Sequence, residues 1–297
     1  MVTEMAGQKT LGVLFGVAAG GMWAIETILG KLMLSSLSFL QVTASEAFFA
    51  AVTAFAFILL RRENVRIKNA SFRDIVSVGL MGTVLAPLVY FYGLTQTLAV
   101  NAALIAHLQP LFVSILGSFF LRERIRKNDI LGGVLVGSSV IMITGRTIEN
   151  IVNLKLGNIG DVVVLLATLL WAFTAIPGKR LTRYESSVLI VGYRFLVASF
   201  IFLPVLFLLN QLAIKSIFQV LLGITVGLGY VFYYEGLKRI KASQVAITEL
   251  SSPFFVAVLA WFLLGEHTTM IQIIGAFLLT IGLATLTMEK TSRSNNV

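Results

Sequence analysis

Five ionisable side chains lie inside long apolar stretches of the sequence, where water does not solvate them. They are Glu26, Glu46, His107, Arg194 and Glu249. A charged group at the centre of a membrane helix costs roughly 2.5–3.5 kcal/mol on insertion scales, so it needs a partner, a water-filled cavity or a function. Carboxylates that share a site also oppose one another's ionisation, so a cluster of them favours the uptake of a proton or another cation.

The depth of each ionisable residue suggests two groups. Counting about 1.5 Å per residue along each predicted helix places Glu26, Glu46 and His107 at one depth in the outer half of the membrane. Arg194 and Glu249 share a depth in the inner half. We expect the first group to form a proton or cation site, and the second to form a gating pair or to bind a zwitterion. The alternative is fixed structural pairing that only neutralises buried charge, and a lone His is more often a packing residue.

Aromatic and polar side chains near the same helices could line a cavity for a solute. Trp23 and Trp171 lie near the middle of apolar segments, where an interfacial aromatic belt does not explain them. The other candidates for cavity lining are Thr27, Tyr90, Gln96, Asn101, Gln109, Thr174, Tyr230, Tyr234 and Ser252. The alternatives remain open: the tryptophans could be core packing, the tyrosines an interface belt, and Ser or Thr hydroxyls often bond only their own backbone.

Two prolines interrupt corresponding apolar segments. Pro110 and Pro253 each remove one helical hydrogen bond, which frees a backbone carbonyl. Freed carbonyls beside a cavity can coordinate a solute or an ion in transporters. The alternative is a fixed kink that only shapes the bundle.

The composition identifies the class of protein that holds these residues. Of 297 residues, 57% are hydrophobic and only 12% are charged, and the mean hydropathy is +0.91. A soluble domain carries about 25% charged residues, so we predict an all-α, multi-pass membrane protein. The chain contains no cysteine, which excludes disulfides and thiolate metal sites. The net charge of +9 is explained by cytoplasmic loops, so we expect no nucleic-acid partner.

Ten apolar segments are long enough to be candidate membrane helices, each needing about 20 residues. We predict them at 11–34, 39–60, 74–96, 99–121, 128–145, 158–182, 186–209, 215–237, 243–264 and 271–288. The connections between them are short, and the longest, near 61–73 and 146–157, are polar. No room remains for a soluble domain.

The second five segments repeat the first five. Trp23 matches Trp171 and Glu46 matches Arg194 at an offset of 148 residues. In the later helices Gly93 matches Gly236, as Pro110 matches Pro253 and Glu123 matches Glu266, at an offset of 143. Constant offsets indicate a duplication. We therefore predict two five-helix repeats, at 1–150 and 151–297.

An odd number of helices per repeat forces the two repeats into opposite orientations. With the N-terminus in the cytoplasm, 18 of the 23 Lys and Arg residues fall on the inner side, four on the outer side, and Arg194 within a span. The positive-inside rule therefore predicts cytoplasmic N- and C-termini. Inverted repeats of this kind are typical of secondary transporters, which bind the solute near the midplane between the halves.

At this point the chain resembles a known family, the EamA branch of the drug/metabolite transporter superfamily. The resemblance rests on paired motifs in order along nearly the whole chain: GMWA at 21–24 with LWA at 170–172, YGL at 92–94 with EGL at 235–237, QP at 109–110 with SP at 252–253, and LRE at 121–123 with LGE at 264–266. It implies ten helices around a central cavity, alternating access, and export or import of amino acids, purines, other metabolites or drugs. Glu46 and His107 depart from the usual pattern.

We therefore expect a secondary transporter that exports small organic solutes, such as amino acids, related metabolites or drugs, across the cytoplasmic membrane. A channel or a membrane-embedded receptor is the alternative. No nucleophile–base pair or catalytic motif supports an enzyme. We expect no cofactor and no metal, a small solute and membrane lipid as partners, and a monomer or homodimer.

Overall fold

A computed structural model describes residues 2–120, 127–155, 157–240, 245 and 248–287. Within these ranges the chain contains helices and no strand. The first half holds α1 (Val2–Met33), α2 (Phe39–Leu60), α3 (Asn69–Gly79), the π-helix η1 (Leu80–Leu85), α4 (Ala86–Leu94), α5 (Ala99–Ala106), α6 (Gln109–Phe120) and α7 (Lys127–Gly145). After the short α8 (Ile148–Val152), the second half holds α9 (Ile159–Leu181), α10 (Ser187–Leu208), α11 (Ile217–Arg239), α13 (Ser251–Leu264) and α14 (Met270–Thr287).

The predicted all-α, multi-pass class is confirmed. Six helical segments of the described chain are long and apolar enough to cross a membrane, and four shorter apolar helices complete the set at 99–113, 130–145, 251–264 and 270–285. These ten segments coincide with the ten that the sequence predicts, apart from their ends. The third span begins at Asn69 instead of residue 74.

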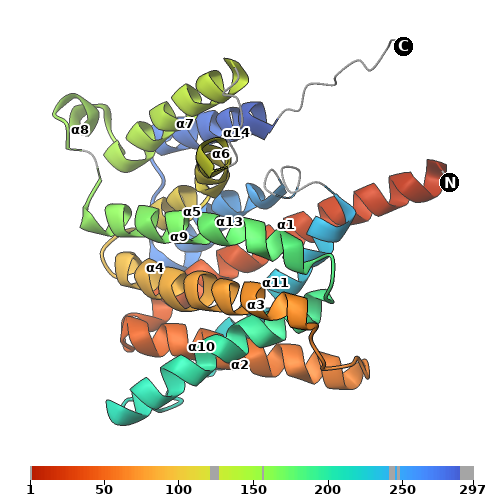
Figure 1. The fold of residues 1–297 in the computed structure, drawn as a ribbon. Coiled ribbons are helices and arrows are strands. Elements are labelled where there is room, and N and C mark those ends of the chain that lie inside the picture. Colours follow the sequence, from red (N-terminus) through yellow and green to blue (C-terminus); the bar gives the residue numbers. More distant parts are fainter. Residues whose placement is uncertain (1, 121–126, 156, 241–244, 246–247, 288–297) are drawn as a thin grey trace, which may run out of the picture.

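Equivalent helices of the two halves lie antiparallel to each other. Ser38 and Gln41, at the start of α2, hydrogen-bond Gln211 just after α10, while Ser186, just before α10, donates to Glu63 just after α2. The pair α7 and α14 shows the same relation, because Gly275 lies beside Ser139 to Ile143 and Gly282 beside Leu135 and Val136. Figure 1 shows these two pairs at opposite edges of the bundle. The predicted inversion is therefore present.

The helices between those edges also pair reciprocally. Helix α1 packs on α11 of the other half, and α9 packs on α3, η1 and α4. Glycines mark both crossings: Gly93 lies against Gly160, and their equivalents Gly236 and Gly12 lie against each other. Small residues let membrane helices approach closely. The two halves therefore interlock through matching surfaces.

A lysine contact recurs within each half. Lys31 Nζ donates to the carbonyl oxygens of Leu94, at 2.7 Å, and Thr97. Lys179 Nζ donates to the carbonyl oxygen of Leu237, at 2.9 Å. Lys31 and Leu94 are the residues that the offsets of 148 and 143 match with Lys179 and Leu237. In both halves, the first helix thus caps the last turn of the third.

The connection between the halves contains a helix that we did not predict. The polar segment near 146–157 includes α8, whose N-cap Thr147 accepts a hydrogen bond from the Asn150 amide. This helix spans the predicted boundary between residues 150 and 151. The division of the chain at that point stays a prediction.

Both predicted prolines lie in the first turn of a helix. Pro110 is the second residue of α6 and Pro253 the third residue of α13. A proline is tolerated in the first turn because the amide that it lacks would have no helical partner there. The fourth span is broken just before Pro110, at His107 and Leu108, so that the break and not a kink separates α5 from α6.

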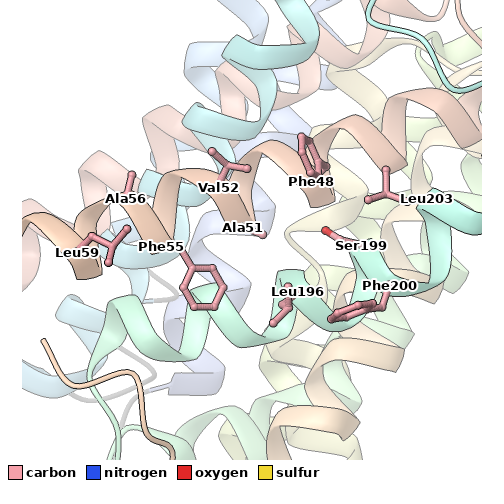
Figure 2. A pocket seen from close by; sticks show the side chains of 10 residues that line it. All are labelled: Phe48, Ala51, Val52, Phe55, Ala56, Leu59, Leu196, Ser199, Phe200 and Leu203. Atoms are coloured by element: carbon pink, nitrogen blue, oxygen red, sulfur yellow. The ribbon is translucent and has the colours of Figure 1, made fainter.

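A groove between α2 and α10 opens on the surface of the bundle. Its lining residues are Phe48, Ala51, Val52, Phe55, Ala56, Leu59, Leu196, Ser199, Phe200 and Leu203 (Figure 2). Its single hydroxyl, that of Ser199, donates to the Phe195 carbonyl within α10. The groove is therefore apolar and does not coincide with the predicted central cavity, which stays a prediction.

Candidate functional site

The guanidinium of Arg194 occupies the interior of the bundle with only 2% of the residue exposed. Its Nε donates to Thr83 Oγ1 at 2.8 Å, its Nη1 to Tyr234 Oη at 3.1 Å, and its Nη2 to the Gly82 carbonyl at 3.1 Å. Its Cζ lies 3.9 Å from the centroid of the Tyr230 ring. All three nitrogen atoms are therefore engaged, and an aromatic ring packs against one face.

The π-helix η1 presents the Gly82 carbonyl to this arginine. The same oxygen accepts a second hydrogen bond, from Trp171 Nε1 at 3.1 Å. A Cβ on residue 82 would lie 2.9 Å from Thr174 Cγ2 and 3.2 Å from Arg194 Nη2, so the close approach requires glycine. Short π-helical turns occur often at functional sites because they interrupt the regular hydrogen-bond ladder. Here the interruption lets one half of the chain accept two donors from the other.

The two predicted tryptophans each contact the opposite half. Trp23 Nε1 donates to Glu249 Oε1 at 2.8 Å, and its ring meets the edge of Tyr230 at 4.7 Å between centroids. The Trp171 ring lies 5.4 Å from that of Tyr90. Each tryptophan of one half thus pairs with a tyrosine of the other. The pairing is the one expected for a site between inverted repeats.

Two carboxylates lie within electrostatic reach of Arg194. Glu26 is 9% exposed and Glu46 is 2% exposed, and they interact electrostatically with each other and with Arg194. Neither forms an ion pair with a residue that the structure describes. The Oε2 atom of Glu46 is buried without a hydrogen-bond partner in the described chain. A buried carboxylate without a partner is costly and is a candidate for binding.

The charges are grouped differently from the prediction. Arg194 joins Glu26 and Glu46, whereas Glu249 joins Trp23 and forms no ion pair with Arg194. His107 Nδ1 contacts the Ala103 carbonyl at 2.7 Å, and the ring also faces the backbone of Glu249. Depth along a helix does not give the direction in which a side chain points. In addition, the break after α5 turns His107 away from the continuous helix that was assumed.

Other predicted lining residues lie close to the tryptophans. Thr27 Oγ1 is 2.8 Å from Tyr90 Oη and bonds the Trp23 carbonyl, while Thr174 donates to the Trp171 carbonyl at 2.7 Å. Gln109 Nε2 lies 3.5 Å from the same Trp171 carbonyl, and Ser252 is buried in the first turn of α13. Tyr234, another predicted lining residue, accepts a hydrogen bond from Arg194. Of these residues, Tyr234 contacts the arginine directly, and Thr27, Thr174 and Gln109 contact the backbone of the two tryptophans.

Gln96 and Asn101 lie elsewhere. Gln96 is exposed just beyond α4, and Asn101 belongs to a polar network at one end of the bundle. Thr97 and Asn101 both donate to Asp161, and Gln272 Nε2 donates to Asn101 Oδ1 at 2.7 Å. We call Thr97, Asn101, Asp161 and Gln272 the Asp161 network. It joins the starts of α5, α9 and α14.

The sequence did not predict the Asp161 network. Asp161 follows Asn158 at the spacing of a helical capping box, which the structure contains, and that signal explains why an acidic residue stands there. Glu266 reinforces the same end by accepting hydrogen bonds from the Ala99 and Val100 amides, at 3.0 and 3.3 Å. Its repeat partner Glu123 lies outside the described residues. The other end of the bundle carries the ion pairs of Arg180 with Asp74 and of Glu235 with Lys238 and Arg239.

Comparison with known proteins agrees with this architecture. The sequence profile of the EamA-like transporter family matches residues 10–145 and again 158–288. An uncharacterized transporter of Methanothermobacter thermautotrophicus is 27% identical over 93% of this chain and 85% of its own length. The pseudopaline exporter CntI of Pseudomonas aeruginosa is 23% identical over 94% of this chain and 96% of its own. A solved crystal structure shares the fold at a TM-score of 0.67 and 18% identity, covering 94% of this chain and 98% of its own.

Proposed function

Because the chain belongs to the EamA-like transporter family, we propose that it moves a small organic solute across the cytoplasmic membrane by alternating access. Its relatives carry the names of transporters, one of them an exporter, which supports a transporter and not an enzyme. The antiparallel halves supply two equivalent surfaces, as such a mechanism requires. We infer export, and the sequence leaves amino acids, related metabolites and drugs open as solute classes.

The solute site that we propose lies between Trp23 and Trp171, beside Glu26 and Glu46. The observation that carries this proposal is the presence of two buried carboxylates that have no ion-pair partner among the described residues and lie next to aromatic contacts that join the two halves. Buried ionisable groups in membrane helices mark substrate and ion pathways. Rocking of the halves would expose these side chains first to one side of the membrane and then to the other.

Counterflow in proteoliposomes tests the transport proposal. A thermal-shift screen of amino acids, amines and nucleobases on the purified chain first identifies a ligand. Vesicles loaded with that ligand should then accumulate the radiolabelled ligand transiently, because a carrier exchanges solute across a closed membrane. A channel would give flux without saturation or counterflow, and a receptor would bind without flux; either result contradicts the proposal.

The proposed orientation can be tested because the natural chain lacks cysteine. Single cysteines at Ser35 and at Arg62, both exposed and at opposite ends of α2, serve as labelling sites. A membrane-impermeant maleimide applied to intact cells should label the Ser35→Cys variant and spare the Arg62→Cys variant. The reverse pattern would place the termini outside.

A further inference from the structure

The carboxylates and the arginine of the central site differ in whether their polar atoms already have partners within the described chain. Glu46 has an oxygen that is buried and without a partner in the described chain, and Glu26 beside it forms no ion pair there. Glu249 is different, because its Oε1 accepts the Trp23 indole. Two acidic groups are thus available near a single guanidinium, and a bound cation or a proton would relieve their mutual repulsion.

Arg194 is not available to a negatively charged ligand. Its three nitrogen atoms donate to Thr83, Tyr234 and Gly82, and Tyr230 packs against its face. Binding a carboxylate at the guanidinium would require breaking contacts with both η1 and α11. A carboxylate ligand would also meet Glu26 and Glu46, which act electrostatically on the same site.

Aromatic rings accompany the available carboxylates. Tyr90 and Tyr230 both lie within electrostatic range of Glu26 and Glu46. Tyr230 packs on Trp23, and Tyr90 packs on Trp171. The faces of aromatic rings attract organic cations through the negative side of the ring quadrupole, and they also bury the apolar part of the same molecule. They offer no comparable attraction to an anion.

We propose that the solute is a monovalent organic cation with an aromatic or apolar body, bound by the Glu26 and Glu46 carboxylates and by the rings of Trp23 and Tyr230. This inference rests on the proposed transport function and names its substrate class. Arg194 acts as a positioning residue that holds η1 and Tyr234 and supplies no contact to the solute. A zwitterion, which the sequence alone allowed, would need a free cationic group that the described site lacks.

Four probes that share a benzyl group and differ in charge test the inference. The purified full-length chain is titrated with benzyltrimethylammonium, phenylacetate, phenylalanine and benzyl alcohol, and binding is followed by tryptophan fluorescence and by the melting temperature. The expected result is a saturable response to benzyltrimethylammonium at concentrations at least tenfold below those at which the other three act. An equal response to the anion or the zwitterion, or no response to the cation, overturns the inference.

Variants then assign the response to the carboxylates. Glu26→Gln and Glu46→Gln should each weaken binding of benzyltrimethylammonium at least tenfold, and Glu46→Asp should retain most of it. Glu149→Gln, which changes an exposed residue of α8, is the matched control and should bind as the natural chain does. Unchanged binding in both carboxylate variants would overturn the inference, and an unaltered melting temperature without probe shows that they fold.

Two further readings separate this inference from the transport proposal. If benzyltrimethylammonium binds but shows no counterflow, the cation site stands and the transport proposal fails. If phenylalanine or phenylacetate shows counterflow while the cation neither binds nor moves, transport stands and the cation inference fails. Stabilisation by NaCl relative to an equal concentration of choline chloride, with no effect of benzyltrimethylammonium, would assign the carboxylates to an inorganic ion and overturn the inference.

Discussion

The two ends of the bundle are built from equivalent residues but are held together differently. At one crossing, a Cβ on Gly93 would lie 2.9 Å from the Gly160 carbonyl oxygen; at the other, a Cβ on Gly236 would lie 3.5 Å from that of Gly12. The Asp161 network reinforces the first crossing. At the second crossing two of its members are replaced by apolar residues, since Val13 matches Asp161 and Ile240 matches Thr97. The first crossing is therefore closed by backbone contact and hydrogen bonds, and the second by looser packing beside apolar side chains.

Positions 46 and 194 show the same divergence in the interior. They are equivalent by the offset of 148 residues, yet one is a carboxylate with an oxygen that has no hydrogen-bond partner in the described chain, and the other is a guanidinium whose three nitrogen atoms all donate. Duplication thus supplied two similar positions, of which one now carries structural hydrogen bonds and the other is the one that we propose for a ligand. The symmetry of the backbone therefore does not extend to the chemistry of the site.

The largest effect is expected from Arg194→Met. Removing the guanidinium leaves the Glu26 and Glu46 carboxylates without a countercharge and deprives Gly82, Thr83 and Tyr234 of a partner. Loss of one member of a buried charged group costs about 3–5 kcal/mol, which thermal unfolding in detergent would detect as a lower melting temperature. The equivalent change, Glu46→Gln, should leave stability unchanged or raise it. Similar losses in both variants would contradict the contrast between the two positions.

A smaller loss is expected from Asp161→Ala. The buried carboxylate accepts hydrogen bonds from Thr97, Asn101 and the Asn158 amide, and hydrogen bonds to charged groups contribute about 1.5–3 kcal/mol each without being additive. We expect a destabilisation of about 3 kcal/mol, measured by unfolding in SDS. Val13→Ala changes the equivalent exposed residue and should alter stability by less than about 0.5 kcal/mol. Equal effects would show that the two ends do not differ as described.

Adding a single methyl group at each glycine crossing compares the two crossings more directly. Gly93→Ala forces a Cβ against the Gly160 backbone and should destabilise the chain by about 1–3 kcal/mol, the usual cost of overpacking. Gly236→Ala meets only ordinary contact distances and should be neutral within about 0.5 kcal/mol. Melting temperatures of the two variants, measured side by side, check the difference. A larger loss at residue 236 would reverse the assignment of the tighter end.

The smallest effect is expected where the two halves still agree. Lys31→Met removes bonds to two carbonyl oxygens and Lys179→Met a bond to one, and both lysines are partly exposed. Solvent screening limits the loss to about 1 kcal/mol or less in each case. Chemical unfolding of both variants should give a slightly larger loss for Lys31→Met. A loss in only one of them would show that the recurring contact is not equivalent.

The apolar runs of the sequence were sufficient to predict the spans, because a membrane helix needs a long uninterrupted stretch. The odd number of helices in each repeat also predicted the inversion that the contacts of Ser38 and Ser186 show. Two local features were beyond the sequence. The π-helix at Leu80–Leu85 is stabilised by donors from Trp171 and Arg194, which are far away along the chain. The helix α8 lies in a segment whose polarity predicts only a loop.

The sequence predicted several residues of the candidate site but few of the contacts between them. Trp23, Trp171, Glu26, Glu46 and Arg194 do lie between the halves, because apolar surroundings make each of them conspicuous. The predicted pair of Arg194 and Glu249 is not among the described ion pairs, and it stays a prediction, since depth along a helix does not fix the direction of a side chain. Gln96 and Asn101 were assigned to the cavity from polarity alone, and their surroundings at the end of the bundle depend on the distant residues Gly160, Asp161 and Gln272.

The widened turn at Leu80–Leu85 has a consequence for how the third span responds to strain. A π turn contains one residue more than an α turn, so the helix can pass this surplus residue along its length while both of its ends keep their place. Each such step rotates the residues in between by about 100°. Gly82 lies within this turn, and its carbonyl oxygen accepts hydrogen bonds from Trp171 and Arg194. These two donors from the second half of the chain therefore hold the extra residue at its present position.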